Sequence, residues 1–228
     1  DWVEVAIQQT LDELVQRNCS RVVWFCSGTE SAKFIGNFIR SIETNFDVFE
    51  LDEDVSNAIS KLDNSQSPVL LICGGELEEG LNLHGPNRTV VNFDIPLNPN
   101  RIEQRIGRVD RFGSMNFQLL SVRNVSNELE SKIHEINESV LGIFKHSVAS
   151  LQFSIERFYS ELTTNLAAEG TVALDVLKDS LLGPDGIARE LARIKQQESL
   201  ERLAARQDDT FAQLQLVDDG WRDFRRST

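Results

Sequence analysis

Short apolar runs alternate with segments of helical period through the first 125 residues. The runs are rich in β-branched residues and lie at 21–26, 47–51, 68–73, 88–94 and 117–122. Between them, apolar residues recur every three or four positions over 2–17, 29–43, 54–63 and 99–111. Apolar runs of this length are typical of buried strands. Strands alternating with helices predict an α/β fold, a parallel sheet with helices on both faces.

The pattern changes after Val125, because no further strand-like run follows. Apolar residues step by three or four from Leu129 to Leu162, which predicts one long amphipathic helix, or two stacked helices with Gly142 as a kink. The chain then contains, in order, a break at "EGT", a short helix over "TVALDVLKDSLL", a break at "GPDG" and a polar helix over about 187–207. We therefore expect an α/β domain over 1–125 and an all-helical region over 126–228.

Composition narrows the class of protein. The chain has 228 residues, a net charge of -13 and 40% hydrophobic residues, which indicates a water-soluble globular protein that binds polyanions only through local positive features. It has no apolar run long enough for a membrane span and no leader-like start, so we expect a cytoplasmic protein without a membrane partner. Three cysteines inside or near apolar runs predict buried thiols, and three scattered histidines predict no metal site.

One basic stretch departs from this acidity. In "NPNRIEQRIGRVDRFGS", residues 98–114, Asn98 is a preferred helix N-cap and Pro99 suits the first helical position, so a helix is predicted to begin there and to end near Gly113. At 100° per residue the arginines fall on one face, beside an apolar face of Ile102, Ile106 and Val109. The face consists of Arg101, Arg105, Arg108 and Arg111.

A face of four like charges needs an explanation, because repulsion between neighbours weakens a helix. The helix itself places no acid on that side. Two interpretations remain open from spacing alone: a solvated basic face, or an anion site, since guanidinium groups match phosphate oxygens.

The same stretch resembles a known motif. The segment "QRIGRVDR" resembles the Q/H-R-x-G-R-x-x-R block that closes the second RecA-like lobe of superfamily-two helicases and translocases. The longer "CGGELEEGLNLHGPNRTVVNFDIPLNPNRIEQRIGRVDRFG" is similar to the RapA-type branch of the Swi/Snf ATPases, in the order of its strand, E-G-x-N turn, F-D-x-P-x-N-P strand end and arginine block. The resemblance is strong over 68–114 and extends back to Arg21, where "VVWFCSGTESA" is similar to the lobe's first strand and turn.

The resemblance implies how these residues would act on ATP. In the family, ATP and Mg²⁺ lie between two lobes, and the second lobe presents arginines to the γ-phosphate. Carried over by position, the arginine fingers would be Arg108 and Arg111, and Gln104 and Arg105 would shape the same surface. The "EGLN" turn would approach the ribose through Gly80 and Asn82 and couple it to the nucleic-acid track.

Nucleic-acid contacts are implied at two loops. One follows the first strand, with Ser27 and Gly28, and Ser27 with Glu30 is typical of a capping box opening a helix whose amides can hold a phosphate. The other holds Gly74 and Gly75, where many relatives have a hydroxyl, so only backbone contact is expected there.

The first lobe's parts are missing. The chain has no G-x-x-x-x-G-K-[ST] loop, and "FELDEDV" at 49–55 imitates an acidic helicase box, although Asp54 or Ser56 is well placed simply to cap the next helix. We therefore expect the C-terminal half of an ATP-dependent DNA translocase, part of a longer protein and inactive alone. Its expected partners are the first lobe, double-stranded DNA, and RNA polymerase or a defence or remodelling complex.

Two alternatives belong to other classes. A strand-separating helicase of another branch would share the arginine motif, but "FDIPLNP" argues against it. A non-enzymatic interaction module derived from a helicase lobe would be marked by loss of the finger arginines, and both are present.

Overall fold

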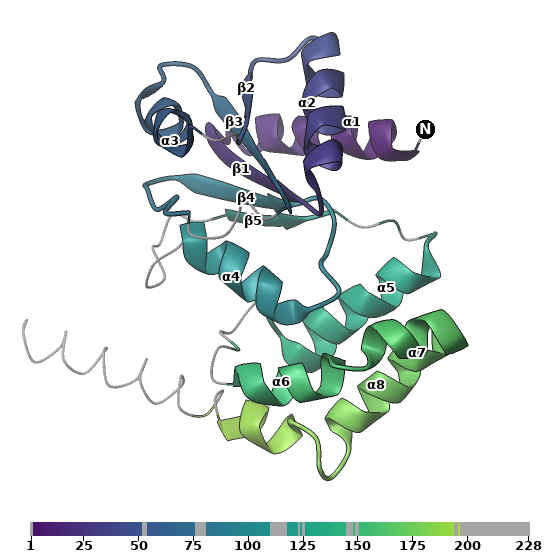
Figure 1. Cartoon of the computed structure of the whole chain (residues 1–228). Helices are drawn as coiled ribbons and strands as arrows, with labels where there is room; N and C mark the ends of the chain where they lie inside the picture. The colour runs from purple at the N-terminus through teal and green to yellow at the C-terminus, as the bar shows by residue number, and fades with distance from the viewer. Residues whose placement is uncertain are drawn as a thin grey trace, which may run out of the picture. The chain divides into compact units, whose positions relative to one another are not determined.

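The computed structural model describes residues 2–51, 54–75, 81–109, 118–122, 124, 126–144, 148, 151–193 and 196. The chain divides into two compact units, Asp1–Asp179 and Ser180–Thr228. The first unit contains a parallel sheet, its flanking helices and a group of further helices (Figure 1). The candidate site lies in this unit.

Strands and helices alternate as the hydrophobic pattern predicts. In order the elements are α1 (Trp2–Gln16), β1 (Arg21–Cys26), α2 (Thr29–Ser41), β2 (Asp47–Glu50), α3 (Val55–Asn64), β3 (Val69–Gly74), β4 (Arg88–Asn92), α4 (Pro99–Val109) and β5 (Gln118–Ser121). The strands pair in the order β2-β3-β1-β4-β5, and every pairing is parallel. The prediction of an α/β fold with a parallel sheet is therefore confirmed.

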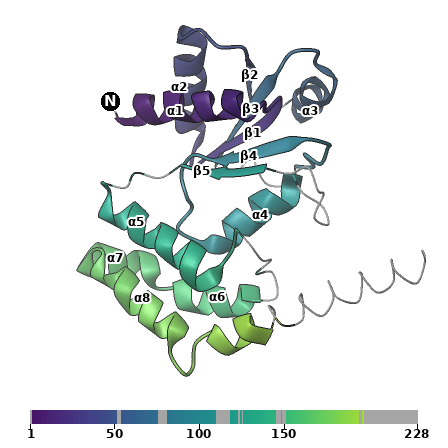
Figure 2. The ribbon, with the colours of Figure 1, turned by 180° about the vertical axis from the view of Figure 1, so that it is seen from behind.

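Alternating residues of the central strand serve opposite faces of the sheet. Val22, Trp24 and Cys26 join the core beneath α1 and α2, whereas Val23 and Phe25 join the core beneath α3 and the end of α4. Figure 2 shows the two helix layers from behind. Because both faces are covered, β1 is a nearly continuous apolar run, as expected for a central parallel strand.

Two predicted helix starts are confirmed by their caps. Asn98 Oδ1 accepts a hydrogen bond from the backbone N–H of Asn100 at 3.0 Å, directly before α4. Asp54 caps α3 by accepting from the N–H of Asn57 at 3.1 Å. Asp54 therefore serves as a helix cap, in agreement with the view that the acidic stretch 49–55 only imitates a helicase box.

Of the two arrangements predicted over 129–162, one continuous helix is wrong, and the chain is closer to the alternative of separate helices. The chain forms α5 (Glu128–Glu135), the π-helix η2 (Ile136–Leu141), α6 (Gln152–Tyr159) and α7 (Leu162–Glu169). Gly142 takes a left-handed conformation with φ 66°, and its N–H bonds back to the carbonyl of Asn137, which ends the helix rather than kinking it. The spacing of apolar residues does not reveal such a break, because the helices on both sides bury their apolar residues at the same intervals of three or four.

The apolar stripe is largely buried, as expected for apolar residues on a helix of a globular protein. Among its buried members are Ile133, Ile155 and Leu162. The helix α8 (Val172–Leu182) is joined to α5 by the ion pairs Lys132–Asp175 at 2.7 Å and Lys178–Glu135 at 2.6 Å. Of the predicted polar helix, residues 188–193 are helical, and most of its remaining length lies outside the described residues.

Candidate functional site

Two glycine-containing loops meet at the carboxyl ends of β1 and β3. A Cβ placed on Gly74 would lie 2.5 Å from the carbonyl oxygen of Gly28, so the loops approach each other more closely than a side chain allows. Gly75 has φ +72°, a conformation that suits glycine. The fold therefore brings together the two loops that the sequence proposes for nucleic-acid contact.

A hydroxyl lies beside these glycines, although sequence reasoning missed it. Thr29 Oγ1 is 3.1 Å from the position that a Cβ of Gly75 would occupy. Thr29 is the first residue of α2, so the hydroxyl comes from the loop after β1 rather than from the loop after β3. Only the close approach of the two loops reveals it, because the two positions are 46 residues apart in the sequence.

The capping box at Ser27 and Glu30 is wrong. The N-cap of α2 is Gly28, which offers no side chain, while Ser27 Oγ donates to Asp94 Oδ2 at 2.8 Å. Glu30 pairs instead with Lys33 at 2.8 Å. The helix begins one residue later than a capping box requires, which moves Glu30 from the third to the second helical position. Ser27 therefore links the loops after β1 and β4.

Arg105 is a structural residue as well as a member of the motif. Its side chain is 1% exposed. The guanidinium donates to the carbonyls of Cys26 and Asp94, each at 3.2 Å, and lies 5.3 Å from the ring centre of Phe25. The expected common face of four arginines is thus wrong at this position. On the helix Arg105 projects about 40° from Val109, close enough to the core side to be drawn beneath the strand ends.

Arg101 and Arg108 are both half-buried, but they differ in what they contact. Arg101 donates from Nη2 to the carbonyl of Gly75 at 3.3 Å, so it too is tied to the glycine loops. The guanidinium of Arg108 has no hydrogen-bond or ion-pair partner among the residues that the structure describes. Gln104, on the same helix, is exposed. The helix therefore uses two arginines for the fold and leaves one available.

The loop that precedes β4 lies against the last turn of α4. The N–H of Leu83 donates to the carbonyl of Arg108 at 2.9 Å, and His84 Nε2 is 3.1 Å from the carbonyl oxygen of Gly107. Asn82, in the same loop, is exposed, and its Oδ1 accepts from the N–H of His84 at 3.4 Å. The other two predicted site residues, Gly80 and Arg111, lie outside the described part of the chain.

Across the described ranges, no three His, Cys, Asp or Glu side chains are grouped as a metal ion would need. Within the same ranges, none of the helices combines the length and the apolar character of a bilayer span.

Comparison with known families agrees with the fold and with the arginine motif. Residues 6–113 match the family model of the helicase conserved C-terminal domain. This part of the chain, which includes β1 to β4 and α4, is therefore similar to a helicase C-terminal domain.

The relatives by sequence are RapA proteins. The RNA polymerase-associated protein RapA of Serratia proteamaculans is 26% identical over 170 residues, which cover 71% of this chain and 17% of that protein. RapA of Cronobacter sakazakii is 31% identical over 109 residues, covering 47% of this chain and 11% of that protein. The chain thus spans less than a fifth of the length of the RapA relatives it matches, and the RapA resemblance of its motifs is confirmed.

Solved helicase structures align more loosely. The C-terminal part of the Fun30 ATPase domain aligns with a TM-score of 0.48 and 16% identity, covering 77% of this chain and 52% of that one. The C-terminal domain of the DEAD-box protein Dbp5 aligns with a TM-score of 0.47 and 18% identity, covering 60% and 79%.

Proposed function

We propose that this lobe is the second half of an ATP-driven DNA translocase, and that Arg108 and Arg111 contact the γ-phosphate of ATP held by a first lobe. The observation that carries the proposal is the difference between the arginine side chains of α4 in what they contact. Arg101 and Arg105 donate to backbone carbonyls, whereas the guanidinium of Arg108 has no partner among the described residues. A charge that the fold does not use is available to a ligand.

The other proposed nucleotide contacts are compatible with this arrangement. Gln104 and Asn82 are exposed, so both can reach a ligand outside the lobe. Arg105 would contribute indirectly, because its bonds to the carbonyls of Cys26 and Asp94 hold α4 against the ends of the strands. ATP and Mg²⁺ would be bound mainly by the first lobe, since this chain has no phosphate-binding loop in its sequence. This chain's own contribution would be positive charge at the transferred phosphoryl group.

The proposed track is double-stranded DNA, contacted at the meeting point of the two glycine loops. The first turn of α2 points its amides there and its N-cap, Gly28, provides no side-chain bond to them. Helix N-termini of this kind favour phosphate. Ser27, Gly74 and Gly75 would shape the approach, and Thr29 adds a hydroxyl. The name of the RapA relatives supports RNA polymerase as a further partner.

The proposal is tested in the intact parent protein by Arg108→Ala. An arginine finger is worth about 10³ to 10⁵ in turnover, or roughly 4 to 7 kcal/mol of transition-state stabilisation. ATP affinity should change much less, and the thermal midpoint should stay near that of the wild type, because the side chain is not used by the fold. Arg101→Ala is the matched control on the same helix and should reduce turnover only mildly.

Equal and small effects of both substitutions on turnover would mean that the arginines form only a solvated basic face. An intact parent that shows no ATP turnover would instead support the alternative of a non-enzymatic interaction module. Strand-separation assays on the same preparations distinguish a translocase from a helicase of another branch, since a translocase consumes ATP on duplex DNA without releasing single strands.

A further inference from the structure

The turn of α4 that carries Arg108 is held by the loop of residues 81–85. Its backbone receives two contacts from that loop. The carbonyl of Arg108 accepts from the N–H of Leu83 at 2.9 Å. The carbonyl of Gly107 lies 3.1 Å from His84 Nε2, and because a carbonyl can only accept, His84 must donate from Nε2. Both bonds fall on the turn that carries Arg108.

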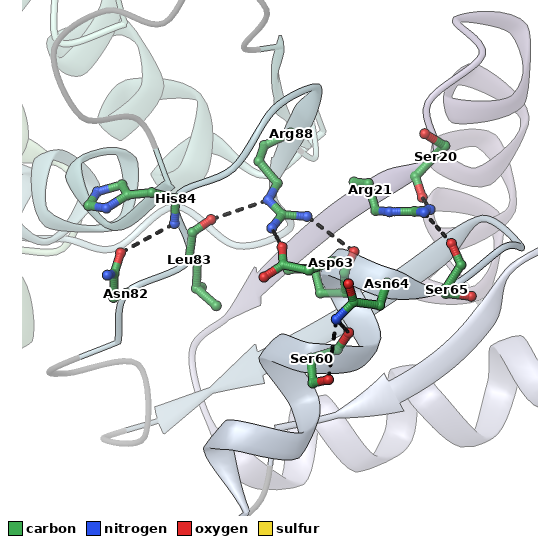
Figure 3. A network of polar contacts seen from close by, with 11 residues as sticks. Ser20, Arg21, Ser60, Asp63, Asn64, Ser65, Asn82, Leu83, His84 and Arg88 are labelled. Atoms are coloured by element: carbon green, nitrogen blue, oxygen red, sulfur yellow. Dashed lines mark hydrogen bonds and ion pairs between the residues drawn. The ribbon is translucent and has the colours of Figure 1, made fainter.

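The loop is itself anchored to the body of the lobe through Arg88, whose side chain is 2% exposed. Arg88 Nε donates to the carbonyl of Leu83 at 3.3 Å, and Nη1 donates to the carbonyl of Leu62, at the end of α3, also at 3.3 Å. Its other terminal nitrogen pairs with Asp63. Figure 3 shows Arg88 between the loop and the end of α3. The loop is therefore bonded to α4 on one side and, through Arg88, to the end of α3 on the other.

A glycine allows this anchor to lie close to the loop. A Cβ on Gly85 would lie 2.4 Å from a terminal nitrogen of the Arg88 guanidinium. The contacts run continuously from α3 through Arg88 to Leu83 and His84, and from there to the backbone of Arg108.

We propose that His84 is a positioning residue for Arg108, acting through the backbone of the α4 turn that carries it. The inference rests on the proposed function of Arg108 as an arginine finger. Without the Nε2–H bond, the carbonyl of Gly107 loses its contact with the loop, and the turn that carries Arg108 is held less firmly. A displacement of about 1 Å at a reacting group can cost about 10² in rate. His84 touches no reacting group, so its loss should affect turnover and leave nucleotide binding largely intact.

The experiment uses the intact parent and two substitutions of His84. His84→Leu retains much of the volume and cannot donate a hydrogen bond, and we expect kcat for ATP to fall about 10- to 100-fold with KM changed less than about threefold. His84→Gln places an amide donor at about the reach of Nε2, and turnover should return to within about threefold of the wild type. Asn64→Ala is the control, because Asn64 belongs to the same group of contacts and, within the described part of the chain, its side chain bonds only to Ser60 on α3.

A double-mutant cycle with Arg108→Ala separates this inference from the function on which it rests. If His84 acts through Arg108, His84→Leu should have little further effect once Arg108 is gone. Multiplied effects in the double variant, or an unchanged kcat in His84→Leu alone, would overturn the inference while the large effect of Arg108→Ala still stood. A negligible effect of Arg108→Ala would instead overturn the proposed function. Failure of glutamine to restore turnover would overturn the inference, because the loss in His84→Leu could then not be assigned to the donated hydrogen bond.

Discussion

Arg105 provides the sharpest test of how α4 is attached to the sheet, through the substitution Arg105→Met. Methionine keeps an unbranched apolar stem and removes every donor, so the carbonyls of Cys26 and Asp94 lose the guanidinium at 3.2 Å. A buried acceptor left without a partner costs about 1 to 3 kcal/mol. The contact with the ring of Phe25 adds about 1 kcal/mol. Relief of the buried charge offsets part of this sum, and we expect a net loss of about 3 kcal/mol.

The assay is urea unfolding of the 228-residue chain, followed by tryptophan fluorescence. Trp24 is fully buried in β1, with its ring centre 5.3 Å from that of Phe93, so its emission reports on the sheet. In a thermal melt of the same variant, a loss of 3 kcal/mol corresponds to a fall of about 6 to 12 °C in the midpoint for a chain of this size. Arg108→Met, one turn along the same helix, is the control and should change stability by less than about 0.5 kcal/mol. Similar losses in the two variants would refute the structural role assigned to Arg105.

Two further predictions concern backbone packing and pH. Gly74→Ala should lower the free energy of unfolding by about 1 to 3 kcal/mol, because the new Cβ would meet the carbonyl of Gly28. Gly107→Ala, where the new Cβ meets open space, should be neutral or stabilising, and a thermal melt of the two variants compares them. The hydrogen bond from the Thr171 hydroxyl, and after it the contact with Lys132, lowers the pKa of Glu128 from its ordinary 4.5. The ionised carboxylate therefore keeps these bonds at pH values above 4.5 and loses them as the pH falls through the lowered pKa. Amide exchange in α5 should rise over that acid range, and unchanged exchange would contradict the assignment.

The order of strands and helices could be predicted because it depends on burial. Both faces of β1 are covered, so its apolar run coincides with the strand itself, Arg21–Cys26. The caps at Asn98 and Asp54 could be predicted for a different reason, since their side chains bond to backbone only two or three residues away. Both features depend on residues close together in the sequence, so the sequence alone is enough to predict them.

Other features depend on contacts between distant segments, or on backbone geometry, and could not be predicted. Whether Arg105 lies in solvent or beneath the strand ends depends on the tilt of α4 against the sheet, because its projection falls between the apolar face and the basic face. Thr29 meets Gly75 only after the loops have packed. The left-handed turn at Gly142 leaves the apolar spacing on either side unchanged, so the pattern alone could not decide between one continuous helix and two stacked helices.

The three thiols of the chain have a practical consequence. Cys19, Cys26 and Cys73 are all buried and form no disulfide, and Cys26 Sγ lies 3.5 Å from the carbonyl oxygen of Cys73 on the neighbouring strand. Burial of all three thiols should keep the folded chain unreactive toward maleimide reagents without any prior cysteine removal. One cysteine introduced at the exposed Gln104 would then carry a fluorophore on the arginine helix alone, and energy transfer to a labelled nucleotide could follow the approach of the two lobes during turnover.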